Sequence, residues 1–70
     1  MKLKQAIKIA KKKGYNWAAV DKDDEICMYD TKPFINIPEN MWDTRGECKL
    51  IAGYTGSKHW TKTRRKVKCQ

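Results

Sequence analysis

The sequence is poor in large aliphatic and phenylalanine side chains, because Leu, Ile, Val and Phe together supply only eleven of its 70 residues. With a net charge of +8, this composition approaches that of chains that bury too little apolar surface to fold. Three Trp and three Tyr compensate, since each ring buries a large apolar area. We therefore expect one small, basic, folded domain over residues 1–70, without room for a large composite active site.

Long apolar runs and paired cysteines are also missing. No apolar segment approaches the roughly 20 residues of a membrane span, and Lys4, Lys8 and Lys11 interrupt any signal-peptide hydrophobic region. The cysteines are three in number and form no CxxC pair, which favours neither a disulfide framework nor a zinc site. We therefore expect a cytoplasmic protein that needs no metal or other cofactor.

Patterns typical of catalysis or calcium binding are incomplete. The acidic stretch 21–25 begins like a calcium-binding loop, but Ile26 and Lys32 stand where that loop needs Gly and a bidentate Glu. Residues 53–57 lack the lysine of a phosphate-binding P-loop, and the spacing of His59 from the cysteines does not favour a catalytic pair. We expect a protein that is not an enzyme and has no catalytic residue.

The hydrophobic pattern predicts an α+β domain with an N-terminal helix packed on a small three- to four-stranded antiparallel sheet. Over residues 2–13, Leu3, Ala6, Ile7 and Ala10 share one helical face, and Gly14 is the expected end of the helix. Residues 15–20 and 25–29 predict a hairpin whose acidic turn needs a positive φ angle, for which Asp24 is the candidate.

The remaining elements are less sharply defined by the sequence. Prolines bracket residues 34–38, which predicts a short edge strand or a packed loop, and residues 48–54 predict a third strand. Residues 57–67 fit two alternatives. One is a short C-terminal helix that Ser57 caps and in which Trp60, Arg64 and Val67 share a face; the other is a last strand.

Charge is distributed unevenly along the chain. Residues 1–14 and 48–70 contain six and seven basic residues and no acid, whereas all eight acids lie between them. If the two basic ends pack side by side on one face of the sheet, they form a single surface that attracts polyanions. The predicted binding residues, of which Arg64 and Arg65 beside Trp60 are the best candidates for a specific contact, are Lys4, Lys8, Lys11, Lys12, Lys58, Trp60, Lys62, Arg64, Arg65, Lys66 and Lys68.

We expect nucleic acid to be the ligand, with an acidic surface of a host protein as the alternative and simple solvation of the lysines as the default explanation. Trp17 and Trp42 are expected in the core, and Trp60 either at its edge or in contact with a ligand. A second group of apolar residues either packs under the sheet or anchors a protein partner: Phe34, Ile35, Met41 and Trp42.

One stretch also resembles a known group of proteins. The segment 17–24 (WAAVDKDD), followed by Tyr29, Lys32-Pro33, Trp42 and Trp60, resembles small uncharacterised proteins encoded by tailed bacteriophages. The resemblance covers about residues 15–60, and those proteins usually carry Gly in the turn where this chain has Asp24. It implies an accessory phage product that acts in the host cytoplasm by binding, often by inhibiting a host factor.

Overall fold

The computed structural model describes residues 1–67, so the predicted contact Lys68 lies outside the described residues. Helix α1 (Leu3–Lys12) fully buries Ala6 and Ala10, and Leu3 and Ile7 pack beside them, which confirms the predicted apolar face. Gly14, at φ 84°, ends the helix as expected, in a conformation that residues with a Cβ rarely adopt.

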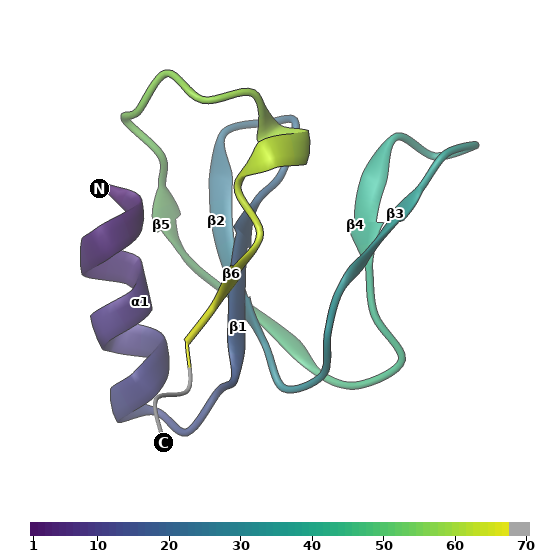
Figure 1. The fold of residues 1–70 in the computed structure, drawn as a ribbon. Helices are drawn as coiled ribbons and strands as arrows, with labels where there is room; N and C mark the ends of the chain where they lie inside the picture. The colour runs from purple at the N-terminus through teal and green to yellow at the C-terminus, as the bar shows by residue number, and fades with distance from the viewer. Residues whose placement is uncertain (68–70) are drawn as a thin grey trace.

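Four antiparallel strands form the main sheet: β1 (Trp17–Val20), β2 (Glu25–Tyr29), β5 (Cys48–Gly53) and β6 (Arg65–Lys66). Their spatial order is β5-β2-β1-β6, and α1 covers one face of the sheet (Figure 1). Asp24 has φ 60° in the turn between β1 and β2, as the sequence predicts. The predicted α+β class is therefore confirmed.

Side chains of β1 alternate between two separate cores. Ala18 and Val20 face α1, together with Met28 and Ile26 from β2. Ala19 faces the opposite side, where it packs with Tyr29 and Trp42. Because α1 and the segment that contains Trp42 cover the two faces of the sheet at β1, Ala18, Ala19 and Val20 are fully buried in a domain with few aliphatic residues.

A hairpin of β3 (Phe34–Asn36) and β4 (Met41–Asp43) covers the face of the sheet opposite α1 (Figure 1). It accounts for the expected edge strand, which is confined to residues 34–36. Ile35 pairs with Trp42 across the hairpin, and the Trp42 indole Nε1–H donates to the Val20 carbonyl at 3.0 Å. Trp42 is only 4% exposed, so it belongs to the core and is not available as the anchor for a protein partner.

Residues 57–67, for which the sequence allowed either a short helix or a last strand, contain a short helical turn and a short strand. Residues Trp60–Lys62 form one 3-10 turn, η1, which His59 caps in place of Ser57, and β6 follows. Trp60, Arg64 and Val67 do not share a face: Trp60 packs beside Trp42, whereas Val67 packs with Ala10 on the side of α1. Within residues 1–67 no helix has the length and apolarity needed to cross a bilayer.

Candidate polyanion-binding site

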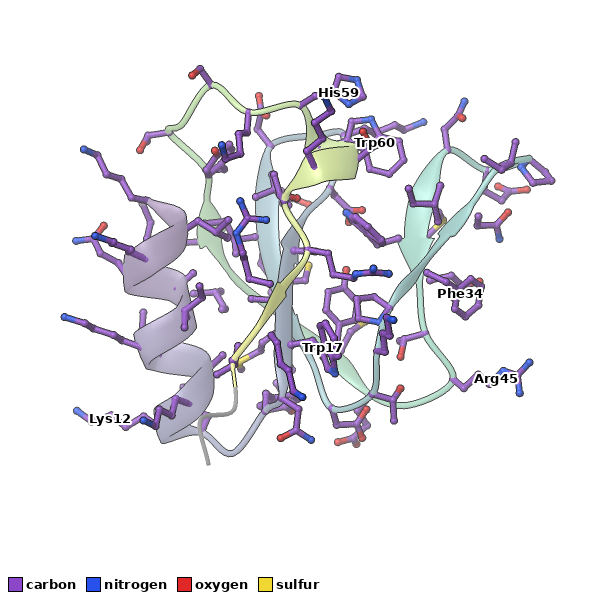
Figure 2. All side chains as sticks on the ribbon, viewed as in Figure 1. Lys12, Trp17, Phe34, Arg45, His59 and Trp60 are labelled. Carbon is purple, nitrogen blue, oxygen red and sulfur yellow. The ribbon has the colours of Figure 1, made fainter. Side chains whose placement is uncertain are left out.

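The two basic segments do not meet on one face of the main sheet, because residues 48–67 themselves supply its strands β5 and β6. Exposed lysines of α1, among them Lys4, Lys8 and Lys11, project from the helix that covers one face, and Lys12 points away from the β3–β4 hairpin (Figure 2). Arg64 lies on the other face, over Trp17 and Trp42. The sheet therefore separates the lysines of α1 from Arg64, so these predicted binding residues do not share one surface.

Arg64 is held in place by two aromatic rings and one carbonyl. The central carbon of its guanidinium lies 5.8 Å from the centroid of Trp17 and 5.8 Å from that of Trp42. Its Nη1 donates to the Pro33 carbonyl at 3.2 Å. A guanidinium over an indole keeps its charge and its remaining N–H donors, so this exposed side chain is positioned but still able to contact an anion.

Two lysines join Arg64 around the half-buried ring of Trp17. The Lys32 ammonium lies 5.8 Å from the ring centroid. Lys66 is the direct partner of Trp17 in the β1–β6 ladder, and directly opposed residues project to the same side of a sheet. We call Trp17, Lys32, Arg64 and Lys66 the Trp17 cluster; it gathers three cations on one face.

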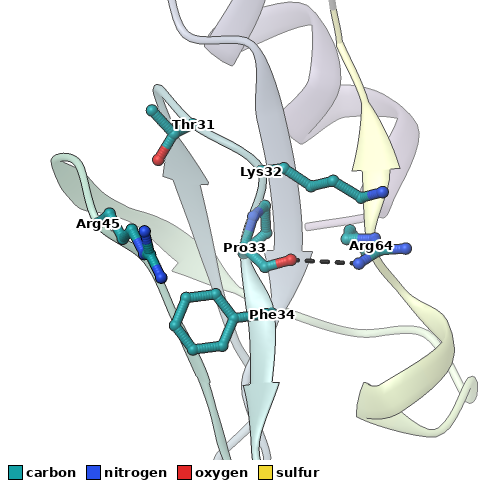
Figure 3. Close-up of a pocket in the computed structure, with 6 residues that line it drawn as sticks. All are labelled: Thr31, Lys32, Pro33, Phe34, Arg45 and Arg64. Atoms are coloured by element: carbon teal, nitrogen blue, oxygen red, sulfur yellow. Dashed lines mark hydrogen bonds between the residues drawn. The ribbon is translucent and has the colours of Figure 1, made fainter.

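A pocket of about 640 Å³ continues this charged face toward the hairpin. Figure 3 shows the Phe34 ring and the Arg45 guanidinium on one side of Pro33, and Lys32 and Arg64 on the other. Phe34 is 44% exposed. The six residues that line the pocket include three cations and no acid: Thr31, Lys32, Pro33, Phe34, Arg45 and Arg64.

Arg65 lies apart from Arg64, although the sequence placed the two together beside Trp60. It pairs with Ala18, which faces α1, so its side chain leaves β6 on the helix side. Its Nη1 donates to the carbonyls of Lys62 (2.9 Å) and Arg64 (3.1 Å). Arg65 therefore closes the end of η1, and only Arg64 joins the Trp17 cluster.

Trp60 lies at the edge of the core. Its ring meets Trp42 edge-on at 6.0 Å and stacks with His59 at 5.9 Å, with 30° between the planes. Lys58 and Lys62 are exposed on the same segment. Among the predicted anchor residues, Phe34 and Met41 are 44% and 39% exposed, while Ile35 turns toward the core with Trp42.

Sequence reasoning missed Lys32 and Arg45, because both lie in the segment that contains all the acids. They reach the pocket because the β3–β4 hairpin folds back over the sheet, which places the flanks of Pro33 beside Arg64. The local signal in the sequence for a fixed position of Lys32 is the Pro33 that follows it, because proline restricts its own backbone and that of the preceding residue.

Two further polar side chains on this face of the sheet stay uncharged at neutral pH. Burial raises the pKa of the Cys27 thiol to about 11, and burial also raises the pKa of the Tyr29 hydroxyl.

Over residues 1–67, no group of three or more His, Cys, Asp or Glu side chains is arranged to hold a metal ion. Comparison of the chain with family models, with curated proteins and with solved structures finds no match.

Proposed function

We propose that this protein is a non-enzymatic accessory module that binds nucleic acid through the Trp17 cluster and the adjoining pocket. The observation that carries the proposal is the position of Arg64, which two indole rings and the Pro33 carbonyl hold in place at the centre of a surface with no acid among its lining residues. The resemblance to phage proteins agrees with an accessory role of this kind.

The chemistry of the surface matches a phosphate backbone. A planar guanidinium can donate two parallel hydrogen bonds to phosphate oxygens, and Lys32 and Lys66 add point charges beside it. Neutralising phosphates releases their condensed counterions, so each contact both strengthens binding and makes it sensitive to salt. The lysines of α1 face away from this site, and in this proposal they contribute long-range attraction rather than contacts with the same nucleotides.

Fluorescence anisotropy with labelled single- and double-stranded oligonucleotides, at roughly 50 and 200 mM salt, tests the proposal. We expect Arg64→Ala to weaken binding about tenfold and to lower the salt slope by about 0.7 for a single strand or about 0.9 for a duplex. The matched control is Lys8→Ala, which removes one exposed positive charge from the opposite side of the sheet. Equal effects of the two substitutions would contradict a defined site and indicate attraction by net charge alone.

An acidic host protein is the second candidate, and exposed apolar residues of the hairpin favour it. Ile37 and Met41 of the hairpin are 71% and 39% exposed. Interfaces with proteins combine such apolar centres with charged rims. If this candidate is correct, Ile37→Ala with Met41→Ala abolishes capture of a partner from host lysate while affinity for oligonucleotides stays unchanged.

A further inference from the structure

We infer that the pocket around Pro33 takes one unpaired nucleotide of a single strand, with its base stacked on Phe34 and its phosphates between Arg45 and Arg64. This inference rests on the proposed function and assigns it a ligand class. Base stacking on an exposed aromatic ring combined with cations along the backbone is the general way in which proteins bind single strands.

The backbone that carries the exposed Phe34 ring is held in place on both sides. The two neighbours of Phe34 are fixed, because Pro33 is fully buried and Ile35 packs toward Trp42. Phe34 itself pairs with Asp43 across the hairpin, so the backbone on both sides of the ring is held. A ring on a fixed backbone loses only its side-chain rotamer freedom when a base stacks on it.

Cations stand on both sides of this ring. Arg45 lies on the same side of Pro33 as Phe34, and Lys32 and Arg64 lie across it (Figure 3). A strand whose base covers Phe34 therefore has a cation available for the phosphate on either side of that nucleotide. The volume of about 640 Å³ falls in the range of pockets that hold small ligands, and it suits one nucleotide. A base inside a duplex cannot use it, because both of its faces are already stacked.

Two acids, Asp43 and Asp30, lie near Phe34 and Arg45, and the carboxylates of both accept hydrogen bonds from the protein. The carboxylate of Asp43 accepts hydrogen bonds from the Thr44 backbone N–H at 2.8 Å and from Asn36 Nδ2 at 3.3 Å. The carboxylate of Asp30 accepts one from the Glu47 backbone N–H at 2.8 Å. These hydrogen bonds spread part of the negative charge of both carboxylates.

The experiment measures affinity of the full chain for three labelled probes of equal length: a thymidine strand of about 12 nucleotides, the same strand with all bases removed, and a duplex. We expect the thymidine strand to bind at least about fivefold more tightly than the abasic strand, which is the weaker end of stacking on one aromatic ring. Phe34→Ala abolishes that preference without changing abasic binding, and Phe34→Tyr preserves it. Ile37→Ala, an exposed apolar residue of the same hairpin outside the pocket, leaves all three affinities unchanged.

The possible failures separate this inference from the proposed function. Equal binding of thymidine and abasic strands, or tighter binding of the duplex, overturns single-strand stacking while an effect of Arg64→Ala still supports a nucleic-acid site. A loss of abasic binding in a Phe34→Ala variant with unchanged near-ultraviolet circular dichroism assigns Phe34 to shaping the cationic surface and also overturns stacking. If Arg64→Ala has no effect on any probe, both proposals are wrong.

Discussion

The hydroxyl of Thr63 provides a sharp test of how the C-terminal segment is attached. Its side chain is fully buried, and its Oγ1 accepts a hydrogen bond from the backbone N–H of Val20 at 2.8 Å and donates to the Trp60 carbonyl at 2.6 Å. Strand β6 pairs only with Trp17 and Ala18, so beyond the end of β6 this side chain takes the place of a strand partner for β1. Thr63 is therefore expected to stabilise the docking of Arg64 through a polar contact.

Thr63→Val keeps the shape of the side chain and removes its hydroxyl. The Trp60 and Val20 carbonyls still accept from the Trp42 indole, so the one group left without a partner is the buried Val20 N–H. An unsatisfied buried donor costs about 1–3 kcal/mol, and we expect a loss of about 2 kcal/mol in the free energy of unfolding. In a domain of this size that corresponds to a decrease of about 10 °C in Tm.

Thr63→Ser provides the matched control, because it keeps the hydroxyl and removes one methyl group worth about 0.8 kcal/mol. Urea unfolding followed by tryptophan fluorescence measures all three proteins. We expect the serine variant to be more stable than the valine variant. The reasoning is refuted if valine is tolerated within about 0.5 kcal/mol and serine is the more damaging change, since Thr63 would then act through packing alone.

Three other perturbations test separate parts of the structure. Burial, assisted by the charge of Asp23, raises the pKa of Asp21 above its usual 3.8, so the stability from this group is complete below that pH and is lost as pH rises through the folded-state pKa. Asp21→Asn should therefore gain more stability relative to the natural chain at pH 7 than at pH 3 in urea melts, and a smaller gain at pH 7 would contradict this. With Cys48 and Cys69 replaced by Ser, Cys27, whose pKa is about 11, should be alkylated by iodoacetamide at pH 8 about tenfold more slowly in the folded chain than in urea; similar rates would show that the thiol is not shielded. At Asp24, with φ 60°, Gly should give a protein about 1 kcal/mol more stable than Ala, and thermal melts in the reverse order would refute left-handed strain in this turn.

Local signals in the sequence were sufficient for the helix and the first hairpin. The 3.6-residue spacing of Leu3, Ala6, Ile7 and Ala10 identified the buried face of α1 because that pattern depends only on the helix itself. The acidic turn similarly identified Asp24 as the residue with a positive φ angle. Both features arise within one or two turns of chain, where residue type largely decides conformation.

Features that depend on distant partners were not predictable in this way. The apolar pattern groups Met41 and Trp42 with Phe34 and Ile35 but predicts no strand over residues 41–43. These residues nevertheless form β4, in which Trp42 packs with Ala19 and Tyr29 and donates to the Val20 carbonyl. Arg64 and Arg65 are adjacent in sequence, but Arg65 pairs with Ala18 and leaves β6 on the helix side, whereas Arg64, just before β6, lies over Trp17 on the other face. Their separation follows from strand alternation, which applies only once a strand rather than a helix is known to form.

The late position of β6 in the chain has a consequence for how the protein is made. Thr63 and Val20 are 43 residues apart, so the edge of β1 has no partner until nearly all the described chain has left the ribosome. Until then the N–H and C=O groups of that edge are open to pairing with other chains, and the rings of Trp17 and Trp42 have no Arg64 guanidinium over them. A ribosome stalled before residue 60 therefore carries a helix and a hairpin without the proposed site. If nucleic acid binds the Trp17 cluster as proposed, it favours the docked β6 and so also protects the open edge of β1.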